Sequence, residues 1–151
     1  MRVGIGYDSH RFADDRELVL GGVRIEHERG LAGHSDADVV THAVIDALLG
    51  AGGLGDLGTH FPPDEEAWRD ADSLDLLRTT LGMLAGSVAN VDVSVICEEP
   101  KLAPHREEMQ ANLGEILGAP VSVKATSNEG MGFVGRGEGI AAIAVALVDA
   151  Q

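Results

Sequence analysis

Hydrophobic residues recur along the chain at two spacings, and each spacing predicts one kind of element. Val3, Ile5 and Tyr7 alternate with other residues, the period of a strand with one buried face. Residues 39–48 instead place valine, alanine and leucine at helical intervals, and Gly21-Gly22 predicts a tight turn inside a hairpin. Strands are expected at residues 2–7, 18–20, 23–25, 90–98, 121–126 and 140–148. Helices are expected at residues 38–50, 73–84 and 104–117.

The order of these elements predicts an α+β sandwich with helices on one face of a sheet. Residues 52–64 are rich in glycine and proline and are expected to form an ordered loop. If the helices cover one face only, the other face, which includes the Ala/Val/Ile-rich last strand, must be buried by something else. Association into a symmetric oligomer is the simplest answer.

The length of 151 residues matches one domain of ordinary size, so we expect a single domain over residues 1–151. The formal net charge of −14 argues against a nucleic-acid partner, because that affinity comes from Lys and Arg neutralising phosphates. A phosphorylated small molecule would need a local island of positive charge, which metal ions could supply.

The start of the chain and its cysteine content indicate a reducing cytoplasm. Cys97 is the single cysteine, so no disulfide can form within the chain, and the first residues lack the charged and apolar parts of a signal peptide. The longest nearly apolar stretch, Gly139 to Val148, is about half of what a membrane span needs. We expect a cytoplasmic protein with no membrane partner.

Asp8, His10 and His42 are the residues expected to bind a divalent metal. Asp8 and His10 stand two positions apart at the predicted end of the first strand, so their side chains can emerge on one face. His42 offers a third ligand if the first helix packs beside that strand, although taken alone it would be a surface histidine. Three such ligands with one open position are typical of catalytic zinc. Asp46, one turn later, either holds a ligand histidine by its second nitrogen or is a solvated helix acid.

A second group of residues is suited to an anionic, hydroxylated ligand. His34 and Ser35 precede a predicted helix, where free backbone N–H groups favour phosphate. Ser35 and Asp38 also have the spacing of a capping box, so Ser35 can cap the helix instead. Acids in segments 56–58 and 61–65 could bind sugar hydroxyls, or could be ordinary loop residues.

The segment from Lys124 to Gly139 combines hydroxyls, an acid, an arginine and several glycines. Backbone can approach a ligand closely in such a segment. Glu129 is suited to a hard cation such as magnesium, and Arg136 to a bidentate phosphate contact. The alternative is a glycine-rich hairpin with an ion pair between Arg136 and Glu138.

Five motifs, in this order, resemble the 2-C-methyl-D-erythritol 2,4-cyclodiphosphate synthase family: RVGIGYDSHRF, LAGHSDADVVTHAVIDALLGA, LGDLGTHFPP, EEPKLAPH and KATSNEGMGFVGRGEGIAAIAVAL. The resemblance runs nearly end to end. It implies ferredoxin-like α/β subunits with a mixed sheet covered by helices on one face. It also implies a homotrimer with active sites at the subunit interfaces and the sheets lining a central channel.

The resemblance implies a role for individual residues. Asp8, His10 and His42 would bind zinc, and Glu129 would help place magnesium or manganese on the substrate diphosphate. His34 and Ser127 would stabilise the transition state. Substrate contacts are implied for Asp8, Ser9, His10, His34, Ser35, Asp56, Leu57, Gly58, Phe61, Pro62, Pro63, Asp64, Glu65, Cys97, Glu98, Glu99, Pro100, Lys101, Leu102, Ala103, Thr126, Ser127, Asn128, Glu129, Phe133 and Arg136.

The chain departs from the family pattern at two places. Asp64-Glu65 stand where Thr-Asp is common, and Ser127-Asn128 stand where Thr-Thr is common. Ser127 keeps a hydroxyl, so its implied role can survive without the methyl group, whereas contacts from the Asp64-Glu65 pair depend on the altered side chains.

The reaction implied by the resemblance is the conversion of 4-diphosphocytidyl-2-C-methyl-D-erythritol 2-phosphate to 2-C-methyl-D-erythritol 2,4-cyclodiphosphate with release of CMP, in the non-mevalonate isoprenoid pathway. Two other functions fit the same residues. A metal-dependent phosphoesterase would use the site to activate water and would release a hydrolysed product. A trimeric metabolite sensor would use zinc as a structural clip, so removal of the metal would dissociate the trimer.

Overall fold

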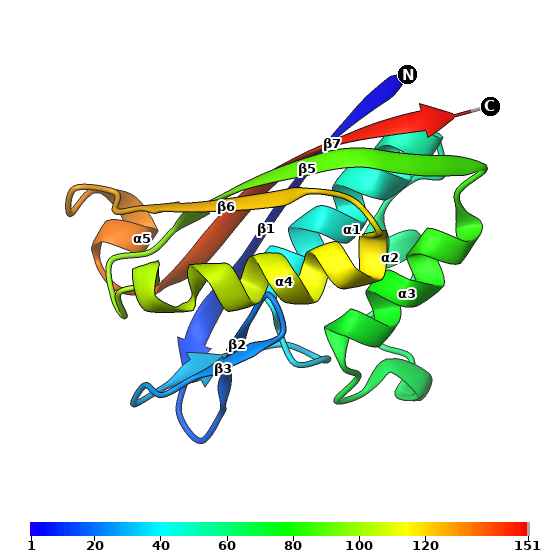
Figure 1. Ribbon diagram of the computed structural model, residues 1–151. Helices are drawn as coiled ribbons and strands as arrows, with labels where there is room; N and C mark the ends of the chain where they lie inside the picture. The colour runs from blue at the N-terminus through cyan, green and yellow to red at the C-terminus, as the bar shows by residue number, and fades with distance from the viewer. Residues whose placement is uncertain (151) are drawn as a thin grey trace.

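The structure is a computed structural model that describes residues 1–150, so Gln151, the last residue of the expected domain, lies outside the described part. Figure 1 shows the arrangement of the elements. The strands are β1 (Arg2–Ala13), β2 (Leu18–Leu20), β3 (Val23–Ile25), β4 (Gly30–Leu31), β5 (Gly86–Ile96), β6 (Val121–Thr126) and β7 (Gly139–Ala150). The helices are α1 (Val39–Gly52), α2 (Leu57–His60), α3 (Ser73–Met83), α4 (Arg106–Leu117) and α5 (Gly132–Gly135), with 3-10 turns at Glu66–Trp68 and Ala103–His105.

A mixed sheet forms the centre of the molecule. Within residues 1–150 its strand order is β4-β1-β7-β5-β6; β7 runs antiparallel to both of its neighbours, and β6 runs parallel to β5. Helix α1 packs on β1 and β7, α4 packs on β6, and α3 contacts both of these helices (Figure 1). The predicted α+β class, with helices against a sheet, is confirmed.

Two glycines in β1 allow α1 to lie directly on the strand. A Cβ atom at Gly4 would overlap the backbone carbonyl oxygen of Ala47, and one at Gly6 would overlap that of Ala43. Any larger residue would therefore push the helix backbone away, because backbone atoms cannot rotate aside as a side chain can. This close approach carries His42, one residue before Ala43, to the polar part of β1.

The sequence placed several element boundaries wrongly. Strand β1 does not end at Tyr7 but continues to Ala13, because its pairing with β7 extends to Arg11 opposite Gly139 and β4 then pairs with Phe12. Short α2 lies inside the segment expected to be a loop, and α5 replaces the alternative of a hairpin near Arg136. Asp8 and His10 are therefore held inside a strand and not at its end.

Asp38, and not Ser35, caps α1. Its side chain accepts from the backbone N–H of Thr41 at 3.0 Å and from the N–H groups of Gly21 and Gly22 at 2.8 Å each. Burial raises the pKa of Asp38, and the negative charge of Asp36 raises it further, whereas the hydrogen bonds oppose the rise. This carboxylate joins the β2–β3 turn to the beginning of α1.

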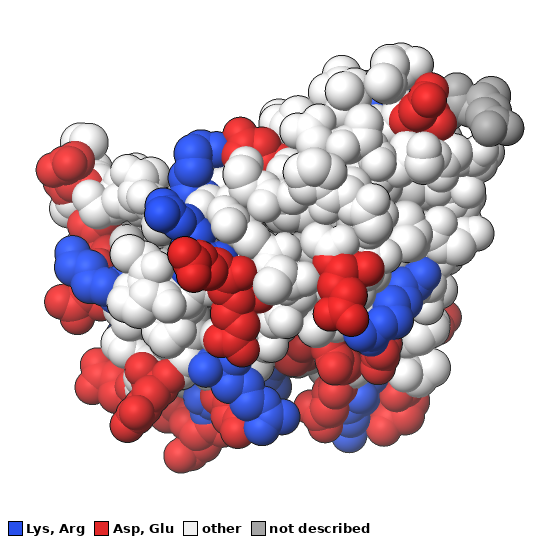
Figure 2. Space-filling model, in the orientation of Figure 1, with Lys and Arg blue, Asp and Glu red and all other residues white. Residues whose placement is uncertain are grey.

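The sheet face opposite the helices exposes apolar side chains. Val3 is 68% exposed, Ile5 69% and Tyr7 55%, and Ile143 and Val145 on the adjacent β7 are also exposed. Charged side chains gather over the lower part of the molecule in Figure 2, whereas its upper part carries few. Exposed apolar surface of this kind is typical of interaction sites. Within the described chain, the helices fall short of the length and apolar character required to span a bilayer.

Candidate metal centre and substrate site

Asp8, His10 and His42 lie together. Asp8 Oδ2 is 3.0 Å from His10 Nε2 and 3.1 Å from His42 Nδ1, and one ligand atom from each residue lies within 4.8 Å of the others. Strand β1 places Asp8 and His10 on one face, and α1 brings His42 against them. The predicted proximity of the three residues is confirmed, whereas the alternative of a surface histidine is wrong because His42 is only 7% exposed.

The hydrogen bonds around the imidazoles leave one nitrogen of His10 free for a metal. His10 Nδ1 donates to the carbonyl oxygen of Ala32 at 2.7 Å, since a carbonyl can only accept. His10 Nε2 is buried and, among the described residues, has no hydrogen-bond partner, although Asp8 lies close to it. A carboxylate and two imidazoles are a donor set that suits zinc. Asp8, His10 and His42, called the metal group below, therefore fit a divalent metal.

Asp8 and His10 each stabilise the charged form of the other. Burial opposes ionisation of Asp8, but the interactions with His10 and His42 outweigh it and lower the Asp8 pKa. Burial likewise opposes protonation of His10, but the Asp8 carboxylate outweighs it and raises the His10 pKa. A bound cation would take the place of the protons that these interactions favour.

Asp46 fulfils neither of the alternatives proposed for it. Its carboxylate accepts from the backbone N–H of Leu57 at 3.1 Å and so holds the beginning of α2 against α1. Burial raises the pKa of Asp46, the Leu57 hydrogen bond lowers it, and the charges of Asp56 and Asp8 raise it further. The second nitrogen of His42 instead lies 2.8 Å from Ser73 Oγ, a contact that the sequence analysis missed. Only the packing of α3 against α1 could reveal this partner.

A pocket opens beside the metal group and brings several predicted substrate residues together. Its walls are formed by Asp8, His10, His34, Ser35, His42, Leu57, Phe61, Pro63, Trp68 and Leu76. Trp68 and Leu76 were not predicted; Trp68 packs edge-to-face on Phe61 with ring centroids 5.1 Å apart. His34 donates from Nε2 to the carbonyl oxygen of Glu65 at 2.6 Å, which ties the 61–65 segment to the segment before α1.

A second pocket also borders the metal group. It is lined by Tyr7, Asp8, His42, Asp46, Asp56, Leu57 and Gly58, so the predicted 56–58 turn does reach the site. Asp56 caps α2, because its Oδ1 accepts from the N–H and hydroxyl of Thr59 at 2.9 and 2.7 Å. Those bonds lower the pKa of Asp56 and keep it ionised near the metal group.

The predicted residues after β5 and β6 form a separate group. Glu98 accepts from the backbone N–H groups of Asn128 at 2.6 Å and Gly130 at 2.9 Å, and so holds the loop that carries Ser127 and Glu129. Glu129 has a φ of +53°, a left-handed conformation that this anchored turn maintains.

Arg136 pairs with Glu138 at 2.6 Å, which confirms the ion pair. Arg136 lines another pocket with Glu98, Glu99, Phe12 and Arg29. That pocket is built from different residues than the pocket beside the metal group, so one chain presents the predicted site in separate parts.

Comparisons with known proteins identify the family. A family model described as the YgbB family matches residues 1–149. This chain belongs to the YgbB family. The 2-C-methyl-D-erythritol 2,4-cyclodiphosphate synthase of Symbiobacterium thermophilum is 57% identical over 154 aligned residues, which cover 98% of this chain and 98% of that protein. The resemblance inferred from the five motifs is confirmed.

Solved structures of the family have the same fold. A cyclodiphosphate synthase with CDP bound superimposes with a TM-score of 0.89 at 33% identity, covering 98% of this chain and 100% of that one. The synthase of Plasmodium vivax gives a TM-score of 0.83 at 34% identity, covering 99% of this chain and 98% of that one. This chain therefore shares its mixed sheet and covering helices with these two synthases.

Proposed function

We propose that this chain converts 4-diphosphocytidyl-2-C-methyl-D-erythritol 2-phosphate to 2-C-methyl-D-erythritol 2,4-cyclodiphosphate and CMP, as a metal-dependent phosphorus–oxygen lyase of the non-mevalonate pathway. The observation that carries this proposal is the Asp8, His10 and His42 group in a chain that aligns over nearly its full length with synthases of that name. The CDP found in a related structure supports a cytidine diphosphate substrate. We place the enzyme in the cytoplasm, as a single catalytic domain.

The reaction balances within one substrate. An oxygen of the 2-phosphate attacks the β-phosphorus, the bond from that phosphorus to the bridging oxygen breaks, and CMP leaves with that oxygen while the eight-membered ring closes. No protein nucleophile is needed, so the chain has to align the attacking and leaving oxygens and offset their charge. Zinc bound to Asp8, His10 and His42 would supply Lewis acidity at a phosphate oxygen.

The polar residues around the metal group have the remaining roles. His34 and Ser127 stabilise the charge that builds up on the transferred phosphoryl group, and Glu129 binds magnesium or manganese on the diphosphate. The 56–58 and 61–65 segments bind the methylerythritol phosphate portion, and residues 97–103 form the cytosine pocket. The position of His34 and Phe61 on the pocket beside the metal group supports this division.

We propose further that three copies of this ferredoxin-like subunit form the active enzyme. The exposed apolar face with Val3, Ile5 and Tyr7 supports an assembly around a central channel, because burial of such surface stabilises association. Glu98 and Arg136 line a different pocket from the metal group, which supports a site completed by a neighbour. In such a site, the loop held by Glu98 would bring Ser127 and Glu129 of one subunit to the metal group of the next.

The test is turnover of the diphosphocytidyl substrate by the purified protein with magnesium, with and without a zinc chelator, followed by phosphorus NMR. Metal-dependent release of CMP with a cyclic diphosphate signal is expected. Hydrolysed substrate would instead identify a phosphoesterase. Intact substrate with fully loaded metal would favour the sensor, particularly if the chelator dissociates the trimer. His42→Ala should lose zinc and turnover together while the protein stays folded.

A further inference from the structure

A chain of hydrogen bonds leads from His42 away from the metal group. His42 Nε2 lies 2.8 Å from Ser73 Oγ, and the Ser73 hydroxyl bonds in turn to Oδ1 of Asp36. Ser73 is the first residue of α3 and is fully buried, whereas Asp36 lies in the segment before α1. This series of hydrogen bonds therefore connects α1 and α3 through the imidazole of His42.

The direction of each hydrogen bond follows from the groups at its ends. An ionised carboxylate can only accept, so the Ser73 hydroxyl must donate its single proton to Asp36. Having given its proton to Asp36, Ser73 Oγ can only accept from His42. His42 Nε2 must then carry a hydrogen. When the ring binds a metal, only Nδ1, which faces Asp8 at 3.1 Å, has a lone pair to offer.

We infer that Ser73, oriented by Asp36, is a positioning residue that fixes the His42 tautomer with Nδ1 free for the metal. The inference rests on the proposed function only in taking Asp8, His10 and His42 as the metal ligands. It gives the two histidines opposite arrangements: His10 donates from Nδ1 to Ala32 and offers Nε2, whereas His42 donates from Nε2 and offers Nδ1.

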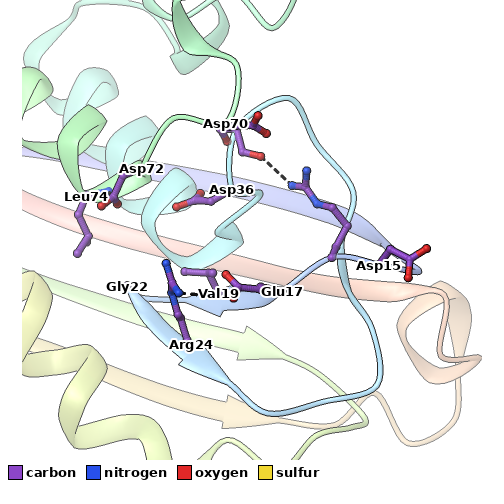
Figure 3. A pocket seen from close by; sticks show the side chains of 11 residues that line it. Asp15, Glu17, Val19, Gly22, Arg24, Asp36, Asp70, Asp72 and Leu74 are labelled. Carbon is purple, nitrogen blue, oxygen red and sulfur yellow. Dashed lines mark hydrogen bonds and ion pairs between the residues drawn. The ribbon is translucent and has the colours of Figure 1, made fainter.

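Asp36 is itself held in place by backbone groups. Among the described residues, it accepts from the N–H of Ser73 at 2.9 Å and from the N–H of Asp38 at 3.1 Å. Figure 3 shows Asp36 in the wall of a pocket that it shares with Asp15, Asp70 and Asp72, on the α1 side of that pocket. Asp36 does not line either pocket beside the metal group, so its influence on that group passes through Ser73.

A contact between Ser35 and His42 limits how much zinc affinity should be lost with the Ser73 hydroxyl. Its Oγ lies 3.2 Å from His42 Nε2 and accepts from the N–H of Ala37, so it is a second and longer partner for the same nitrogen. Loss of the Ser73 hydroxyl would therefore weaken the orientation of His42 without abolishing it. Removal of a group that orients a metal ligand typically lowers metal affinity by about 10- to 100-fold, and the remaining Ser35 contact favours the lower end.

The test combines zinc affinity with the protonation of the imidazole ring. Ser73→Ala removes the hydroxyl but keeps the backbone N–H that Asp36 binds, so α3 retains that anchor. Zinc dissociation constants are measured by competition with a chelator. Thr80→Val is the matched control, because Thr80 is a fully buried hydroxyl on the same helix that donates to the carbonyl oxygen of Leu76. We expect Ser73→Ala to bind zinc about tenfold more weakly and Thr80→Val to bind it as the wild type does.

Long-range proton–nitrogen NMR of the zinc-loaded wild type supplies a second readout that needs no variant. In that spectrum the His42 proton is expected on Nε2. A proton on Nδ1, or zinc affinity in Ser73→Ala equal to that of the wild type, would overturn the inference. If Ser73→Ala does not fold, the wild-type spectrum decides alone. If the wild type binds no zinc, the proposed metal site and this inference fail together. If the wild type binds zinc and Ser73→Ala binds it equally well, only the inference fails.

Discussion

Replacement of Gly6 by alanine should disturb the metal group without touching any of its residues. The new Cβ would overlap the carbonyl oxygen of Ala43 and press on the backbone nitrogen of Ala47. Neither atom can turn aside, so α1 must move away from β1. His42 precedes Ala43 directly, and Asp8 lies two residues beyond the substituted position, so the distance between these two ligands must change.

The magnitude follows from the packing. An extra methyl group in a tightly packed core lowers the free energy of unfolding by about 1–3 kcal/mol, and each kcal/mol corresponds to about 2–4 °C in melting temperature for a chain of this size. Metal sites tolerate ligand displacements of only about 0.2 Å. We therefore expect Gly6→Ala to melt several degrees lower and to bind zinc more weakly than the wild type.

Thermal unfolding of the metal-free protein and chelator competition measure the two effects separately. Gly82→Ala is the matched control, because within the described chain a Cβ at Gly82 meets no atom within 4 Å and alanine favours a helix. It should keep or slightly raise the melting temperature and leave zinc affinity unchanged. Wild-type stability and zinc affinity in Gly6→Ala would refute the argument that close approach of α1 to β1 builds the site.

Three further predictions concern residues that follow β5 and β6. Glu129→Gln should lower turnover and weaken its magnesium dependence; an unchanged magnesium titration would count against that role. Glu98→Gln leaves one backbone N–H of the 128–130 loop without an acceptor, so turnover should fall while zinc content stays constant, and exposed Glu115→Gln on α4 should change neither. Burial raises the pKa of the Cys97 thiol to about 12, above the 9.0 of an exposed thiol, so this group's contribution to stability is full below pH 9.0 and declines as the pH rises toward 12. Iodoacetamide at about pH 8 should therefore label Cys97 only after unfolding, and rapid labelling of the native protein would contradict the buried position.

Alternation and helical spacing determined most of the elements. The hairpin strands at 18–20 and 23–25 and the strand at 121–126 lie where the sequence predicted them, because double glycine and strict alternation are local signals. The end of β1 was missed because nothing local marks it. Its extension to Arg11 depends on pairing with residues of β7 that lie more than a hundred positions away along the chain, and its last two residues pair with β4.

The ligand triad could be proposed from the sequence, whereas its supporting groups could not. Asp8, His10 and His42 are residue types that bind metals, and the five motifs narrowed their role further. Ser73 and Asp36 have ordinary side chains for helix ends and loops, so nothing in their type or spacing indicates a contact with His42. Asp46 had the right helical spacing for such a contact, but the tertiary structure directs it to α2 instead.

By itself, the sequence determined the α+β class and the family and predicted that Asp8, His10 and His42 lie together, because these depend on local periodicity and on residue type. The tertiary structure alone decided how α1 approaches β1, which groups contact each histidine nitrogen, and which sheet face remains uncovered. Such features depend on distances between segments far apart in the chain, which packing sets and no local pattern records.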